Sequence, residues 1–217
     1  MGGMTSLAQE LDGGSGYFMN ARADVVSELV RPLGSVLDVG CGAGNVGPGL
    51  RTAGARRLTG VELVPDAAAA ARERFDEVVE GAIEDALPRL DGPFDTILCL
   101  DVLEHLVDPK AVLTALRGLA GQGARLQVSV PNARHVSLVY DLVVRGTFGY
   151  TAWGHRDHTH LRWFTRRDIV ELVGATGWRV TGVSHPPLGR SRRLDRATRG
   201  RSTEFLVGQW YVAATAT

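Results

Sequence analysis

The segment VLDVGCGAGNVG, at residues 36–47, constrains the fold more than any other part of the sequence. A short apolar run holds Asp38, and glycines follow it at every second or third position. Glycine adopts positive φ at no steric cost and lets a ligand approach the backbone closely. A buried strand, a glycine-rich turn and a helix in this order predict a cradle for a nucleotide-like ligand.

Strand and helix signals alternate along the rest of the chain. Short apolar runs bounded by turn residues predict strands at 35–39, 57–61, 77–80, 94–100, 124–130, 178–184 and 205–213. Apolar residues at helical spacing predict helices at 17–30, 45–53, 65–74, 111–119 and from Thr165 to about 174, where Asp168 completes a capping box. This alternation indicates an α/β protein with a mainly parallel sheet and helices on both of its faces.

Three segments depart from that rhythm. Residues 1–16 are rich in Gly and Ser, which predicts a flexible N-terminus before a single domain at 17–217. Residues 131–164 carry Gly, His, Arg and aromatic residues in place of a strand or helix pattern, so we expect an inserted lid there. Residues 185–204 are rich in Pro and Arg, which predicts a basic loop.

Charge and cysteine content narrow the class of protein. The 24 basic and 24 acidic residues cancel, so the molecule as a whole is not a polyanion binder. Cys41 and Cys99 both lie in apolar runs, which is typical of free buried thiols in a reducing compartment. No apolar run approaches the length of a membrane span, and we therefore expect a cytoplasmic protein.

The glycine pattern by itself fits two kinds of cofactor. Gly42, Gly44 and Gly47 satisfy the G-x-G-x-x-G spacing of dinucleotide-binding proteins, and Glu62 follows at the distance of their ribose-binding acid. A nicotinamide-dependent oxidoreductase is therefore one alternative, and a noncatalytic cofactor-binding protein is another. Asp38 favours a different ligand, because a carboxylate in this strand suits an amino group and would repel a pyrophosphate.

Three motifs together resemble the class I S-adenosylmethionine-dependent methyltransferases. VLDVGCGAG, GVE at 60–62 and DVLEHLVDP at 101–109 occur in that family's order, and the resemblance covers roughly residues 17–184. It implies a Rossmann-like, seven-stranded sheet in the order 3-2-1-4-5-7-6, with strand 7 antiparallel and a lid inserted after strand 5. It also implies S-adenosylmethionine as the cofactor.

The same resemblance implies roles for individual residues. Glu62 would accept hydrogen bonds from the ribose hydroxyls, and Asp38 would orient the loop or the ligand's amino group. Relatives often carry an acid for the adenine amino group where this chain has Ala82, so either Glu84 or Asp85 would substitute or backbone groups would suffice. The cofactor-binding set implied is Asp38, Gly40, Gly42, Gly44, Glu62, Leu63, Glu84, Leu100 and Asp101.

A second cluster follows the strand at 94–100. Its D-x-x-E-H motif resembles the E-x-x-E-H of the ubiquinone-pathway O-methyltransferases and of the small-RNA 3′-terminal 2′-O-methyltransferases. The latter also carry a run similar to HTHLRWFT at 158–165. The resemblance implies a divalent cation, whether Mg, Mn, Fe or Zn, with the ligands Asp101, Glu104, His105 and His160. Alternatively, Glu104 and His105 brace their helical turn while His160 packs within the lid.

These observations predict an S-adenosylmethionine-dependent methyltransferase that acts on a small molecule. An alcohol or phenol acceptor must lose a proton, for which His105 and His160 are the candidate catalytic residues. The lid resembles that of methyltransferases encoded with glycosyltransferases or natural-product pathways, which favours O-methylation in secondary metabolism or glycan modification. Its arginines would allow an anionic acceptor.

An RNA or nucleoside 2′-O-methyltransferase is the alternative within the same chemistry. The run RSRRLDRATRGR at 190–201 holds six arginines against one aspartate, a basic patch that could meet phosphate. It lacks the interleaved aromatic residues on which bases stack, and a solvated loop is the simpler interpretation. Nucleic acid is therefore the less favoured partner.

Overall fold

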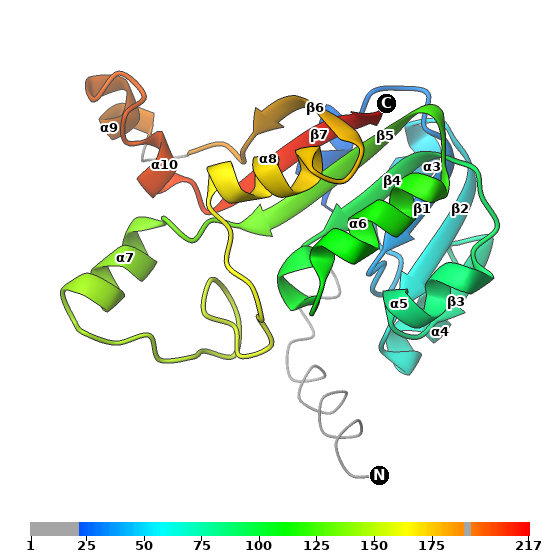
Figure 1. Cartoon of the computed structure of the whole chain (residues 1–217), viewed down its shortest axis with the longest axis horizontal. Helices are drawn as coiled ribbons and strands as arrows, with labels where there is room; N and C mark the ends of the chain where they lie inside the picture. Colours follow the sequence, from blue (N-terminus) through cyan, green and yellow to red (C-terminus); the bar gives the residue numbers. More distant parts are fainter. Residues whose placement is uncertain (1–21, 189–191) are drawn as a thin grey trace, which may run out of the picture. The chain divides into compact units, whose positions relative to one another are not determined.

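The computed structural model describes residues 22–188 and 192–217 (Figure 1). The predicted flexible segment at 1–16 and the first part of the helix predicted at 17–30 lie outside the described residues. The seven strands are β1 (Gly34–Val39), β2 (Ala55–Glu62), β3 (Glu77–Glu80), β4 (Phe94–Leu100), β5 (Ala120–Pro131), β6 (Trp178–Ser184) and β7 (Gln209–Ala216).

Helices connect these strands for most of the chain. They are α2 (Ala23–Glu28), α3 (Gly47–Thr52), α4 (Pro65–Ala71), α5 (Ile83–Ala86), α6 (Pro109–Gly118), α7 (Val136–Val143), α8 (Arg166–Gly174), α9 (Arg192–Ala197) and α10 (Thr203–Leu206). Two 3-10 turns, η1 (Leu87–Arg89) and η2 (Leu103–His105), complete the elements. None of the helices in the described part of the chain is long and apolar enough to cross a lipid bilayer.

The strands form one sheet in the order β3-β2-β1-β4-β5-β7-β6. β1 pairs in parallel with β2, and β2 pairs in parallel with β3, whereas β7 runs antiparallel to both β5 and β6. This is the topology that the family resemblance implied, including the antiparallel β7.

The chain divides into two compact units. One comprises the residues up to Leu98 together with Leu119–Ala124. In this unit the fully buried Leu37 of β1 and Leu58 of β2 belong to an aliphatic core, and their strands pair so that Asp38 lies opposite Gly60. The parallel strands β1 and β2 therefore end at the same level, beside the glycine turn.

The other unit comprises Cys99–Gly118 and Arg125–Thr217. Its core contains the two largest fully buried side chains, Trp178 and Tyr211. The Trp178 indole N–H donates to the carbonyl of Leu113 at 3.1 Å, which joins β6 to α6 and satisfies a buried donor.

The predicted lid at 131–164 contains one helix, α7, and otherwise irregular backbone. Asp141 is buried on α7 and forms ion pairs with Arg145 at 3.0 Å and with Arg156 at 2.9 Å. Phe148 packs edge-on against Trp163, with ring centroids 5.2 Å apart. Ion pairs and aromatic contacts, rather than a hydrogen-bond ladder, therefore organise this segment.

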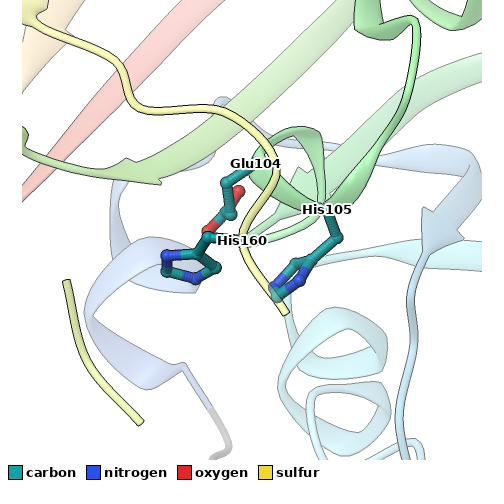
Figure 2. A group of neighbouring side chains, drawn as sticks. All are labelled: Glu104, His105 and His160. Atoms are coloured by element: carbon teal, nitrogen blue, oxygen red, sulfur yellow. The ribbon is translucent and has the colours of Figure 1, made fainter. Parts of the chain in front are cut away.

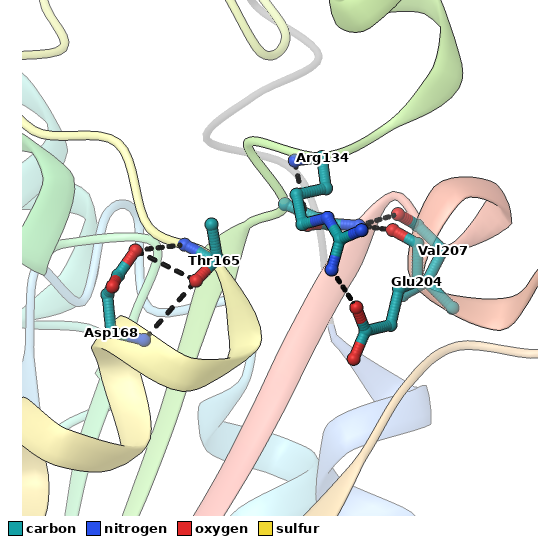
Figure 3. Close-up of polar contacts among 6 residues, drawn as sticks. Arg134, Thr165, Asp168, Glu204 and Val207 are labelled. Carbon is teal, nitrogen blue, oxygen red and sulfur yellow. Dashed lines mark hydrogen bonds and ion pairs between the residues drawn. The ribbon is translucent and has the colours of Figure 1, made fainter.

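The region from 185 to 208 differs from the prediction of a loop followed by a strand. The structure forms α9 and α10 there, and the last strand begins only at Gln209. The reason is tertiary: the buried Asn132 amide donates to the carbonyls of Glu204 and Val207, both at 2.8 Å. The guanidinium of Arg134 also pairs with the Glu204 carboxylate, as Figure 3 shows. These partners are some seventy residues apart in sequence, so a local pattern does not reveal them.

The start of α8 shows a helix boundary that the sequence did predict. Thr165 accepts a hydrogen bond from the Asp168 backbone N–H through its hydroxyl, and the Asp168 carboxylate accepts from the Thr165 N–H and hydroxyl (Figure 3). This capping box satisfies two backbone donors that the first turn of a helix otherwise leaves unpaired.

We predict that Thr165→Ala lowers the free energy of unfolding by about 1 kcal/mol, because the cap is lost. Thr165→Ser keeps the hydroxyl, and its free energy of unfolding should stay within about 0.3 kcal/mol of the native value. Urea unfolding followed by circular dichroism measures both. Equal stability of the two variants would contradict a capping role for the hydroxyl.

Candidate functional site

The glycine turn after β1 has the backbone conformation for which glycine is required. Gly40, Gly42 and Gly44 have φ values of 71°, 54° and 75°. A side chain at Gly44 would also place its Cβ 3.1 Å from the Ala71 Cα. The sequence predicted this turn as a cradle with little side chain, and the positive φ angles give the physical reason for each glycine.

Glu62, the last residue of β2, is hydrogen bonded to this turn. Its side chain is buried, Oε2 accepts from the Gly42 N–H at 2.7 Å, and Oε1 accepts from the Val64 N–H at 2.9 Å. Burial raises the pKa of the Glu62 carboxyl, and the hydrogen bonds from Val64 and Gly42 act in the opposite direction. Glu62 therefore organises the turn in addition to offering oxygen atoms to a ligand.

Asp38 lies on β1 and is buried, with 2% of its surface exposed. Burial and the nearby Glu62 carboxyl raise the pKa of Asp38 to about 7, although Arg22 acts in the opposite direction. Its carboxyl therefore holds a proton well into the neutral range. A cationic group placed beside Asp38 would favour the ionised form.

The other residues assigned to the cofactor occupy varied environments. Leu63 is 47% exposed, and both Glu84 and Asp85 are exposed on α5 directly after Ala82. Leu100 is half-buried at the end of β4.

Asp101 follows Leu100 with a positive φ of 57°. Its Oδ1 accepts from the Ser129 hydroxyl at 2.8 Å and from the Gln209 amide at 2.9 Å. A non-glycine residue in this region is uncommon, and such conformations concentrate at functional sites. The hydrogen bonds from β5 and β7 hold Asp101 in this conformation.

Glu104 and His105 of η2 lie together with His160 of the lid (Figure 2). One ligand atom from each of the three lies within 4.8 Å of the other two, and the two imidazole rings meet edge-on with centroids 4.8 Å apart. The backbone brings them together, because Leu161 and Arg162 both donate their N–H to the Glu104 carbonyl. Three of the four ligands implied for a metal are thus gathered, and Asp101 is not a member of the group.

The cluster is suited to neutral imidazoles. Burial lowers the pKa of both His105 and His160, so each ring has a lone pair available near pH 7. Glu104 is 1% exposed, and Nδ1 of His160 is buried without a hydrogen bond among the residues that the structure describes. Such a set can accept a proton or bind a divalent cation.

The two other histidines of the lid motif lie elsewhere. His155 stacks on His135 with ring centroids 4.7 Å apart and is hydrogen bonded to the Gly208 carbonyl. His158 is exposed. The motif did not mark Asp157 and Thr159 as functional, although they alternate with its histidines. Thr159 contacts the His105 ring directly.

Comparison with known proteins gives a consistent family. A family model described as a methyltransferase domain matches residues 17–183. The ubiquinone biosynthesis O-methyltransferase of Xylella fastidiosa (strain M23) is 40% identical over 119 residues, which cover 51% of this chain and 48% of that protein. The protein of the same name from Dechloromonas aromatica (strain RCB) is 25% identical over 187 residues, covering 82% of this chain and 80% of its own. The chain thus spans about half the length of the Xylella relatives that it matches.

Solved structures share the fold at lower identity. A SAM-dependent methyltransferase from Archaeoglobus fulgidus superposes with a TM-score of 0.64 at 15% identity, covering 99% of this chain and 95% of the other. Magnesium protoporphyrin IX methyltransferase from Synechocystis PCC 6803, solved with bound SAH, gives 0.59 at 20% identity, covering 98% and 84%.

We predict that Asp38→Asn makes the ligand-free protein more stable above pH 7. The folded pKa of Asp38 is raised, so its contribution to stability is complete at low pH and is lost as the pH rises through about 7. The variant carries no such titration and should gain on the order of 2 kcal/mol over the native protein at pH 8, but nothing comparable at pH 4. Thermal melts across this range measure the difference, and a gain independent of pH would contradict the raised pKa.

Proposed function

The chain belongs to the methyltransferase domain family, and on this premise we propose that it transfers a methyl group from S-adenosylmethionine to a hydroxyl of a small-molecule acceptor. The relatives named as ubiquinone biosynthesis O-methyltransferases support oxygen as the receiving atom. The observation that carries the proposal is the buried Glu62 carboxylate, bonded to the backbone of a glycine turn with three positive φ angles. The family assignment decides against the nicotinamide-dependent alternative.

The residues around the turn fit this donor. A carboxylate accepts about four hydrogen bonds, so the N–H groups of Gly42 and Val64 leave Glu62 capacity for ribose hydroxyls. The ammonium group of the methionine part suits Asp38, whose ionised form is costly until a cation lies beside it. For the adenine amino group we assign Glu84, because it follows Ala82 on α5 with an exposed carboxylate.

S-adenosylmethionine supplies a methyl group on a sulfonium sulfur, which leaves as a neutral thioether. The protein's task is therefore alignment and removal of the acceptor's proton. We assign the role of proton acceptor to His105, whose half-buried imidazole is neutral near pH 7. The O–H bond breaks, the proton moves to the ring nitrogen, and the electron pair of that bond remains on oxygen to form the bond to carbon.

A divalent cation held by Glu104, His105 and His160 is the second candidate for that task. The compact group of three possible ligands supports it. One carboxylate and two imidazoles suit Zn, Fe or Mn better than Mg, which prefers oxygen ligands. Such an ion would lower the pKa of a bound hydroxyl and replace the base.

The arginines near α9 and the aromatic residues of the lid support a class of acceptor. Arg196, Arg199 and Arg201 are exposed near α9, which supports an anionic small molecule. The exposed Tyr150 and the half-buried Trp163 supply flat surfaces within the lid. An RNA acceptor is less favoured, because no aromatic residue interrupts the arginine-rich run.

The direct test is to incubate the protein and S-adenosylmethionine with phenols, catechols, sugars and short RNA oligonucleotides, and to measure S-adenosylhomocysteine by chromatography. We expect turnover with at least one small hydroxyl compound. Calorimetric titration of each cofactor into the protein, with no acceptor present, is the second test. Tight NADH binding without binding of S-adenosylmethionine or S-adenosylhomocysteine would refute the proposal.

We predict that Glu62→Gln weakens S-adenosylhomocysteine binding by roughly 10- to 100-fold, because hydrogen bonds to a charged group contribute about 1.5–3 kcal/mol. The matched control is Glu77→Gln, which removes a carboxylate of the neighbouring strand whose partner is Arg57. The control should bind as the native protein does. Calorimetric titration measures both, and equal affinity of the two variants would contradict the role of Glu62.

We predict that Mn²⁺ or Zn²⁺ raises the melting temperature of the native protein and that His160→Gln abolishes this shift. At an ion concentration about 100 times the dissociation constant the stabilisation is about 2.7 kcal/mol. His158→Gln is the control, since His158 lies on the same segment outside the group. An equal shift in both variants would place the ion elsewhere, and no shift in the native protein would leave His105 as the base.

A further inference from the structure

We infer that Asp157 and Thr159 are positioning residues, which hold the His105 ring with its proton on Nδ1 and leave Nε2 as its accepting nitrogen. The chemical purpose of this arrangement rests on the proposed methyl transfer. The arrangement itself can be tested without it.

The first observation concerns the partners of His105 Nδ1. This atom lies 3.3 Å from the Thr159 carbonyl oxygen and 3.0 Å from the Thr159 hydroxyl oxygen. A carbonyl oxygen can only accept a hydrogen bond. Nδ1 must therefore carry the hydrogen if this contact is to be a hydrogen bond.

The second observation fixes the direction of the hydroxyl contact independently. Thr159 Oγ1 also lies 2.8 Å from Oδ1 of Asp157, and the Thr159 N–H donates to the same oxygen at 2.9 Å. A carboxylate has no hydrogen to give, so the single hydroxyl hydrogen of Thr159 is directed to Asp157. The Thr159 oxygen is then an acceptor toward Nδ1, in agreement with the carbonyl contact.

A neutral imidazole carries one hydrogen, so an Nδ1–H ring has its lone pair on Nε2. His105 Nδ1–H therefore donates to Thr159, and the Thr159 hydroxyl donates to the Asp157 carboxylate. This is the logic of a base whose ring is oriented by a third group.

Backbone hydrogen bonds within the turn that carries these residues, and from the residue after it to η2, hold the turn in place. The His160 N–H donates to the Asp157 carbonyl at 3.1 Å, and Leu161 donates to the Glu104 carbonyl at 2.8 Å. The Asp157 side chain is 16% exposed, which limits competition from water. Positioning of His105 therefore does not depend on an exposed, mobile contact.

The test is a two-bond ¹H–¹⁵N correlation spectrum of the full chain labelled with ¹⁵N-histidine, with no donor or acceptor added. His105→Gln identifies the His105 signals by their loss. In the native protein we expect a hydrogen-bearing Nδ1 and an unprotonated Nε2. Thr159→Val should shift the Nε2 signal toward the protonated type, as the Nε2–H tautomer gains population, whereas Thr159→Ser should restore the native pattern.

Asp157→Asn leaves the hydroxyl of Thr159 in place but removes its charged acceptor, and we expect an intermediate shift. Thr151→Val is the matched control, because its hydroxyl bonds to the Trp153 carbonyl within the same lid. An Nε2–H tautomer in the native protein would overturn the inference, as would a native signal in Thr159→Val. Should that variant unfold, the native spectrum and Asp157→Asn decide. The native tautomer without turnover of any acceptor would refute the methyl transfer but not the positioning.

Discussion

The carboxylate of Glu62 is the constraint on which the first unit's site depends. It closes the glycine turn by accepting the Gly42 N–H, although Gly42 follows β1 and Glu62 is the last residue of β2. The pairing of β1 with β2 sets this up, because Val39 lies opposite Val61 and the Val61 carbonyl accepts from both Gly40 and Cys41. The Val61 carbonyl and the Glu62 carboxylate, both of β2, therefore accept the first three N–H groups of the turn.

Close packing around the turn adds a second constraint. A Cβ at Gly60 would lie 2.6 Å from the Cys41 sulfur, so β2 must have a glycine where the buried Cys41 side chain lies against it. Cys41 is therefore explained by packing. Burial also raises the pKa of its thiol, which makes it a poor nucleophile.

Asp38 and Glu62 place two buried carboxyls beside the glycine turn. Burial raises the pKa of both, and the Glu62 carboxyl also raises the pKa of Asp38. Ionising Asp38 therefore costs stability in the ligand-free protein. Under the proposed function, the ribose hydroxyls of the ligand would bond to Glu62 and its ammonium group would lie beside Asp38, which would offset that cost.

The second unit builds its cluster from segments more than fifty residues apart. A single carbonyl, that of Glu104, accepts from two consecutive residues after His160 and so fixes the register of the lid against η2. Thr159 then reaches the His105 ring from the same segment. The lid is thus held where its polar residues meet η2, while Tyr140 on α7 and Trp153 are largely exposed.

The sequence by itself determined the alternation of strands and helices, the capping box at Thr165 and the turn at Gly40–Gly44, because each has a local signature: hydrophobic alternation, side-chain capping or glycine spacing. The sheet order and the antiparallel last strand came from the resemblance of three motifs to the methyltransferase family. It also singled out Glu104, His105 and His160 by their motif. Only the tertiary structure decided that Asp101 is hydrogen bonded to Ser129 and Gln209 and is not one of the three clustered ligands, that α9 and α10 form where a loop was predicted, and that Thr159 contacts the His105 ring. These features depend on hydrogen bonds between distant residues, and such pairings leave no periodic or local trace in a single sequence.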